Sequence, residues 1–174
     1  MTDFSSDRLI GTRARQRPRF RTRPLALIAV PLVAILFQVY APRFLTYLSF
    51  LELPLLVTIY FALSWRQPIA GLLAGCVIGL TQDAFSYQPI GIFGIVKTLV
   101  GYFAASISQR VDTDNRVIRF GLGAFFYFFH QVTYWILVGT LLTQALPFGL
   151  GEVVVFSVLN GLVAASLFGL LDRL

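Results

Sequence analysis

The sequence predicts an all-α integral membrane protein with six transmembrane helices, from its composition, the spacing of its apolar segments and the placement of its arginines. Of the 174 residues, 57% are hydrophobic and 13% are charged, which is about half the charged share of an ordinary soluble domain. Nine of the charged side chains lie before residue 24. Too few remain to cover a core against water, so the core must be buried against lipid.

Six apolar segments are separated by polar or proline-containing connections. A membrane-spanning helix needs about 20 apolar residues, within a range of about 17–25. Proline lies at several segment boundaries, where its missing N–H costs a helix nothing. We therefore expect six helices, with segments at 25–41, 44–63, 68–82, 90–107, 120–142 and 152–171.

Each segment has its own justification. The first is longer than the apolar region of a typical secretory signal, and no small-x-small cleavage site precedes Pro42, so we expect it to be retained. The second contains an internal proline, which we expect to kink it. The third has only about 15 residues, and Gln82 with the turn after it can extend its reach. Pro89 begins the fourth, the polar loop 108–119 precedes the fifth, and the sixth begins at Glu152, whose charge suits a helix N-terminus.

Arginine in the connections predicts the orientation. With the N-terminus in the cytoplasm, an even number of spans places twelve arginines on the cytoplasmic side and only Arg43 outside. An odd number would place Arg173 outside. We therefore expect both termini in the cytoplasm, with residues 1–24 as an arginine-rich cytoplasmic tail and residues 25–174 as a single transmembrane domain.

The tail carries arginine at nearly every second position between residues 13 and 23, and Pro18 and Pro24 disfavour a helix there. Each arginine near the membrane surface contributes about 1 kcal/mol of attraction to anionic lipid. We expect anionic lipids as the partner of the tail, with an acidic cytoplasmic protein as the alternative. No folded module is present that could position a nucleic-acid contact, so no nucleic-acid binding is expected.

Small residues recur at every fourth position in the third and sixth segments. In lipid, helices associate by close packing, and such stripes let two backbones approach. We expect both stripes to pack helices within the chain, with docking of a partner's helix as the alternative. The stripes are formed by Gly71, Gly75 and Gly79 and by Gly161, Ala165 and Gly169.

Two charged residues lie deep in apolar segments. Glu52 is eight residues into the second segment and Lys97 is eight residues into the fourth, so both are expected about 12 Å below the outer boundary. Equal depth and opposite charge predict an ion pair or a shared polar pocket. The alternative is that Lys97 extends outward alone and Glu52 is neutral.

Other polar residues are expected to support the fold. Asp83 and Ser86, in the turn after the third segment, can satisfy free backbone groups at helix ends, with a partner or ligand contact as the alternative. His130, in the middle of the fifth segment, is expected to be a hydrogen-bonded packing residue, and Asn160 can bridge helices. With Cys76 as the single cysteine, neither a disulfide nor a usual zinc site is expected, and no cofactor is predicted. Enzyme motifs and carboxylate pairs at helical spacing are missing from the sequence, so we expect no catalytic activity.

Residues 51–107 contain an ordered set of elements, namely Pro54, Tyr60-Phe61-Ala62-Leu63, Gly71, Gly75, Gly79, Gln82-Asp83, Ser86, Pro89-Ile90-Gly91 and Gly101-Tyr102. In this order, and with the short Asp-x-x-Ser turn, they resemble the core of the rod-shape-determining membrane protein family MreD. The resemblance covers about a third of the chain, and the length and six expected spans fit it as well.

The resemblance implies a non-catalytic scaffold of the bacterial cell elongation complex in the inner membrane. Its implied partner is the bitopic periplasmic scaffold MreC, and through MreC the actin-like filament protein, the glycan polymerase and the transpeptidase of cell-wall synthesis. The implied fold is similar to the substrate-binding subunit of energy-coupling-factor transporters. That similarity supplies the alternative function, a vitamin-binding transporter subunit with an outer pocket to which Glu52, Lys97 and Tyr60 could contribute.

Overall fold

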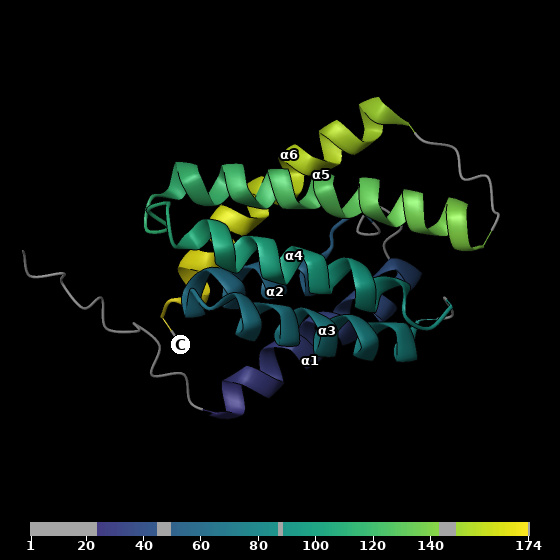
Figure 1. The fold of residues 1–174 in the computed structure, drawn as a ribbon, viewed down its shortest axis with the longest axis horizontal. Coiled ribbons are helices and arrows are strands. Elements are labelled where there is room, and N and C mark those ends of the chain that lie inside the picture. The colour runs from purple at the N-terminus through teal and green to yellow at the C-terminus, as the bar shows by residue number, and fades with distance from the viewer. Residues whose placement is uncertain (1–23, 45–49, 87–88, 143–148, 174) are drawn as a thin grey trace, which may run out of the picture.

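The computed structural model describes residues 24–44, 50–86, 89–142 and 149–173. Within these ranges the chain forms six α-helices joined by short connections (Figure 1). The prediction of an all-helical chain with six helices is confirmed. The helices are α1 (Pro24–Phe44), α2 (Leu53–Trp65), α3 (Pro68–Phe85), α4 (Ile92–Ser108), α5 (Arg116–Leu141) and α6 (Leu150–Leu171).

Three of the described helices, α3, α5 and α6, are long and apolar enough to cross a membrane on their own. The apolar parts of α1, α2 and α4 are shorter, and α2 has only 13 residues. A helix of that length measures about 20 Å, whereas the hydrocarbon core of a bilayer is about 30 Å thick. By length and composition alone, the described helices thus supply three candidate spans.

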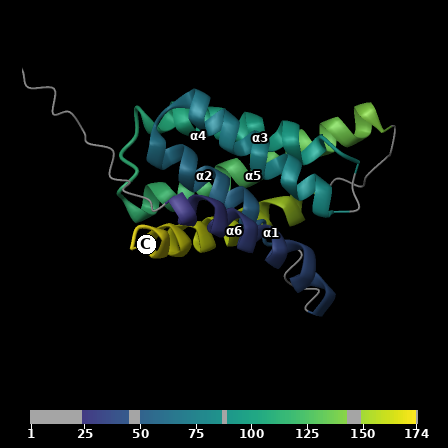
Figure 2. The same ribbon diagram turned by 90° about the horizontal axis from the view of Figure 1, so that it is seen from below.

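α2 lies at the centre of the bundle, between the other helices (Figures 1 and 2). Ten of its 13 residues are buried, and it contacts each of the other five helices. The prediction of one helix over 44–63 is wrong in its described part, because residues 50–52 are not helical and α2 begins at Leu53. Pro54 lies in the first turn, where a missing N–H is harmless, so it starts the helix instead of kinking it.

Three further boundaries differ from those expected. α3 continues to Phe85, so Gln82 and Asp83 lie inside the helix and lengthen it to 18 residues. α4 begins at Ile92 and not at Pro89, because Gly91, with a φ of 107°, turns the chain before the helix starts. α5 begins within the predicted polar loop, where the Asn115 side chain accepts a hydrogen bond from the Val117 N–H at 2.9 Å.

The glycine stripe of α3 packs on the backbone of α4, and the two helices lie side by side in both views (Figures 1 and 2). A Cβ atom added at Gly75 would overlap the carbonyl oxygen of Lys97. Additions at Gly71 and Gly79 would overlap the carbonyl oxygens of Gly101 and Phe93. The face that these three glycines present is therefore occupied within the chain and is closed to a partner's helix.

The small residues of α6 differ in how closely they pack against other helices. A Cβ at Gly161 would lie 2.8 Å from the carbonyl oxygen of Phe120 on α5, so this glycine allows α5 and α6 to approach closely. Ala164 is fully buried on the same face. Ala165 is only half-buried, and an added Cβ at Gly169 would meet no described atom within 4 Å. Of the two glycines in the expected stripe, only Gly161 lies where an added Cβ would meet a neighbouring helix.

One end of the bundle gathers the connections that carry arginine, and we call it the basic end. The Gln109 side chain donates to the carbonyl oxygen of Arg66 at 3.1 Å, and Arg119 forms an ion pair with Asp172 at 2.6 Å. These contacts join the α2–α3 connection, the α4–α5 connection and the end of α6, next to the C-terminus (Figure 1). The basic end is defined by Arg66, Arg110, Arg116, Arg119 and Arg173.

Candidate functional site

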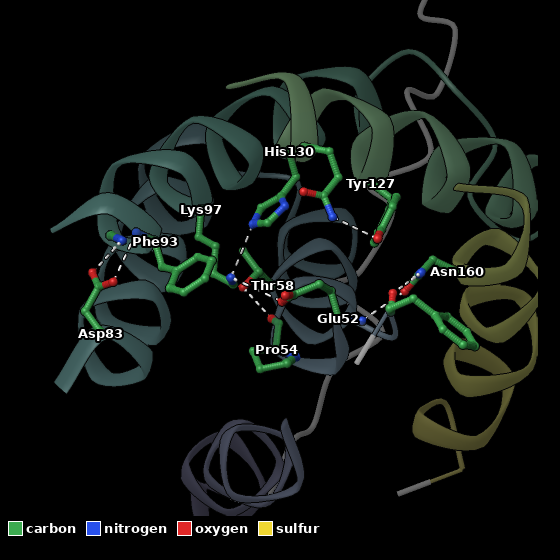
Figure 3. A network of polar contacts seen from close by, with 12 residues as sticks. Glu52, Pro54, Thr58, Asp83, Phe93, Lys97, Tyr127, His130 and Asn160 are labelled. Atoms are coloured by element: carbon green, nitrogen blue, oxygen red, sulfur yellow. Dashed lines mark hydrogen bonds and ion pairs between the residues drawn. The ribbon is translucent and has the colours of Figure 1, made fainter. Parts of the chain in front are cut away.

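A buried polar cluster surrounds Lys97, whose side chain is 0% exposed (Figure 3). Its Nζ lies 3.7 Å from Glu52 Oε2 and 3.5 Å from His130 Nε2. It also lies 4.5 Å from the centre of the Phe93 ring, within the range of a cation–π contact. The structure therefore brings together the predicted pair, Glu52 and Lys97, and adds His130 to it.

Glu52 is held in place from α6. Its backbone N–H donates to Asn160 Oδ1 at 3.1 Å, and Asn160 Nδ2 donates back to the carbonyl oxygen of Phe50 at 2.8 Å. Asn160 is fully buried. Its two hydrogen bonds hold the non-helical residues 50–52 against α6. The expected position of Glu52 inside a helix was wrong, since Glu52 precedes α2. It meets Lys97 because α2 and α4 begin at the same end of the bundle and Lys97 is near the start of α4.

Aromatic and polar side chains on one face of α5, together with Phe93 of α4, complete the cluster. The Phe93 ring stacks on His130 and Tyr134, with ring centres 6.1 Å and 5.3 Å away. Gln131 Nε2 donates to the Tyr127 hydroxyl at 2.8 Å. Positions 127, 130, 131 and 134 recur at three- and four-residue intervals and share one helix face. This spacing was the signal in the sequence that His130 belongs to a polar face and not to an isolated packing position.

Two buried polar atoms in this cluster have no hydrogen-bond partner among the described residues, namely Glu52 Oε2 and His130 Nδ1. Most other polar contacts of the cluster join two parts of the bundle or hold a helix end, whereas the Gln131–Tyr127 hydrogen bond lies within α5. The Thr58 hydroxyl, for example, donates to the carbonyl oxygen of Pro54 at 2.8 Å and closes the first turn of α2. The arrangement can therefore fix α2, α4, α5 and α6 relative to one another.

Asp83 forms a second polar site, next to the cluster, and is 1% exposed. Its Oδ2 accepts hydrogen bonds from the N–H groups of Gly91 and Gly94 at 2.9 and 3.0 Å, and its Oδ1 accepts one from Phe93 at 3.1 Å. The carboxylate of α3 thus satisfies free backbone donors at the start of α4, where negative charge is also favourable. Ser86 contributes locally, since its hydroxyl donates to the Asp83 carbonyl oxygen at 3.4 Å.

Replacing Asp83 with alanine is expected to destabilise the protein by about 2 kcal/mol or more, because three backbone N–H groups at the start of α4 lose their acceptor. Asp83→Asn should have a smaller effect, since one side-chain oxygen remains. Thermal unfolding in detergent measures both changes. Asp112→Ala, at an exposed position in the α4–α5 connection, is the control. Equal stability of the Asp83→Ala and Asp112→Ala proteins would contradict the capping role.

Tyr60 does not join the cluster. Its hydroxyl donates to Asp172 Oδ1 at 3.3 Å, at the basic end, whereas Glu52 precedes the opposite end of α2. Glu52, Lys97 and Tyr60 therefore do not line one pocket, as a vitamin-binding subunit built on these residues would require.

The family model described as rod shape-determining protein MreD matches residues 18–171. The match covers nearly the whole chain, including Asp83, the buried cluster around Lys97 and all six described helices. Neither among curated proteins nor among solved structures does the chain have a significant match.

Proposed function

The chain belongs to the rod shape-determining MreD family, and on this premise we propose that it is a non-catalytic scaffold of the cell elongation complex in the bacterial inner membrane. The observation that carries the proposal is the family match over residues 18–171, which makes the chain a membrane protein of rod-shape determination. The buried cluster supports a scaffold because its contacts hold helices together. A scaffold needs such a fixed shape to present the same surface to its partners.

The partner in this proposal is MreC, a bitopic protein with a single transmembrane helix and a periplasmic part. By binding MreC, the chain would help to couple actin-like filaments in the cytoplasm to the glycan polymerase and transpeptidase outside. The arginine-rich tail would contribute attraction to anionic lipids on the cytoplasmic side.

The proposed topology has six membrane crossings with both termini in the cytoplasm. Its support is the basic end, where the connections and helix ends that carry the arginines at 66, 110, 116, 119 and 173 lie together (Figure 1), as the positive-inside rule requires of one membrane face. α2 has only 13 residues, but it can still be one of the six crossings, because it is surrounded by other helices. Phosphatase fusions should be active at the α3–α4 connection and inactive after residue 174. Activity after residue 174 would overturn the topology.

Co-purification tests the proposed function. The tagged full-length chain, co-expressed with MreC from the same cells, should recover MreC in a stoichiometric complex and should restore rod shape to cells depleted of their own family member. Recovery of a tightly bound vitamin-like molecule without MreC would instead support the transporter subunit. Failure both to bind MreC and to restore cell shape would overturn the scaffold proposal.

A further inference from the structure

The contacts around the buried ammonium of Lys97 are longer than direct hydrogen bonds. Its Nζ lies 3.7 Å from Glu52 Oε2 and 3.5 Å from His130 Nε2, whereas a direct hydrogen bond between an ammonium and a carboxylate measures about 2.7–2.9 Å. The Phe93 ring, whose centre is 4.5 Å away, attracts the charge without accepting a conventional hydrogen bond. An ammonium has three N–H donors, so the described residues give Lys97 too few short acceptors.

The two polar atoms of the cluster without a partner among the described residues, Glu52 Oε2 and His130 Nδ1, have opposite hydrogen-bonding roles. An ammonium can only donate, so His130 Nε2 is the acceptor in its contact with Lys97. A neutral imidazole that accepts at Nε2 carries its proton on Nδ1. His130 Nδ1 is therefore a buried donor, and Glu52 Oε2 is a buried acceptor.

The charges on the neighbouring elements support this assignment of protons. Glu52 precedes α2 and Asp83 lies on α3, and the Asp83 carboxylate is already compensated by three backbone N–H groups at the start of α4. One carboxylate, that of Glu52, is thus left to balance one cation, that of Lys97. A second positive charge, on His130, would lie 3.5 Å from the first. The polar side chains that face the cluster from α5 and α6 are otherwise uncharged, namely Tyr127, Gln131, Tyr134 and Asn160.

Water is the ligand that fits these groups. A metal cation would lie beside the ammonium of Lys97 and an anion beside the carboxylate of Glu52, so both would be repelled. A water molecule accepts and donates, as the cluster requires. A buried ion pair is stable only where further hydrogen bonds satisfy its remaining donors and lone pairs, and an internal water typically makes about three such bonds.

The cluster can be reached by water from the start of α2. The Glu52 side chain is 12% exposed, whereas that of Lys97 is 0% exposed and His130 is 1% exposed. Glu52 belongs to the non-helical residues 50–52, of which Phe50 and Leu51 are only half-buried. Figure 3 shows the side chains of Glu52, Lys97 and His130 converging from three elements, with Glu52 on the side of α6.

We propose that the buried cluster is a binding site for internal water, which accepts hydrogen bonds from Lys97 Nζ and His130 Nδ1 and donates to Glu52 Oε2. Water then joins the start of α2 to α4 and α5, and it solvates the charge of Lys97 inside the bundle. Such a site goes beyond the proposed scaffold function and does not depend on it.

Nuclear magnetic resonance can test the site without ambiguity, because His130 is the only histidine of the chain. The full-length chain is labelled with ¹⁵N-histidine, purified through a tag without histidine and reconstituted in phospholipid bilayers. We expect a protonated Nδ1, an unprotonated Nε2 and transfer of magnetisation from water to the Nδ1 proton. Protonation of Nε2, alone or together with Nδ1, would overturn the site, and so would the absence of transfer from water.

Radical footprinting provides the second measurement, because X-rays generate hydroxyl radicals from bound water and these oxidise side chains that bulk solvent does not reach. His130 should be oxidised at least fivefold faster than Phe168, which is also 1% exposed but lies in the apolar core. Equal oxidation of the two residues would overturn the site, and this comparison needs only the wild-type chain.

A double variant carrying Glu52→Leu and Lys97→Met removes the two charges that hold the water. Its folded fraction, purified by size-exclusion chromatography, should show at least threefold slower oxidation of His130 than the wild type and unchanged oxidation of Phe168. Leu99→Met, at a partly exposed position on α4, is the control and should oxidise His130 as the wild type does. Undiminished oxidation of His130 in the folded double variant would overturn the site.

Discussion

Replacing Gly75 with leucine should abolish the packing of α3 on α4 and with it most of the folded protein. Even a Cβ at this position would overlap the carbonyl oxygen of Lys97 and lie 2.6 Å from its carbonyl carbon. Backbone atoms cannot rotate away as a side chain can, so the two helices would have to separate. We expect a loss of about 3 kcal/mol or more, at or beyond the usual range for overpacking.

A graded series separates this effect from helix propensity. Alanine is a better helix former than glycine by about 1 kcal/mol, so any destabilisation by Gly75→Ala arises from packing alone. Gly139→Leu is the control, because an added Cβ there meets no described atom within 4 Å. Size-exclusion chromatography of fluorescent fusions, before and after heating, measures the folded fraction. A Gly75→Leu protein as stable as the Gly139→Leu protein would show that α3 and α4 do not approach as described.

Lys97→Met should destabilise the protein by about 3 kcal/mol, because it leaves the Glu52 carboxylate without its cation. Methionine preserves the length of the side chain and its contact with Phe93, so the lost charge dominates. Glu52→Gln alone should cost more. It leaves the ammonium of Lys97, which is 0% exposed, unpaired, whereas the Glu52 side chain is 12% exposed and reaches solvent more easily.

The double variant carrying Glu52→Gln and Lys97→Met should recover most of the stability lost in each single variant, since no unpaired charge remains. Apparent unfolding temperatures in one detergent at one pH provide the comparison. Leu99→Met, at a partly exposed position on the same helix, controls for the introduction of methionine. Additive losses in the double variant would mean that the two side chains do not stabilise each other.

Hydropathy and proline placement were sufficient to predict the six helices, because each depends on residues close together in the sequence. The small residues at four-residue spacing in α3 also predicted close helix packing, and the structure shows α4 as the neighbour. The period of a single helix does not say which helix lies opposite. This is why the stripe predicted on α6 contains Gly169, where an added Cβ would meet no described atom within 4 Å, and omits Ala164, which is fully buried.

The polar cluster was predicted only in part because its contacts join distant segments. Glu52 and Asn160 are 108 residues apart, and their hydrogen bond keeps residues 50–52 out of α2. Apolarity alone favoured a helix through those residues. The pairing of Glu52 with Lys97 was expected from equal depth, although the depth of Glu52 was derived from a helix that does not extend so far. The sequence analysis did not place His130 beside Glu52 and Lys97, because no neighbouring residue in the sequence indicates that α5 faces α4 at the level of Lys97.

Enclosure of α2 by the other five helices has a consequence for how the membrane acts on this protein. Hydrophobic matching between helix length and bilayer thickness applies where lipid touches the helix, and most of α2 is solvated by protein instead. Thickening or thinning the bilayer should therefore strain α3, α5 and α6 and leave α2 largely unaffected. Sequence change in α2 should be limited by side-chain volume, as in the interior of a water-soluble domain, more than by affinity for lipid.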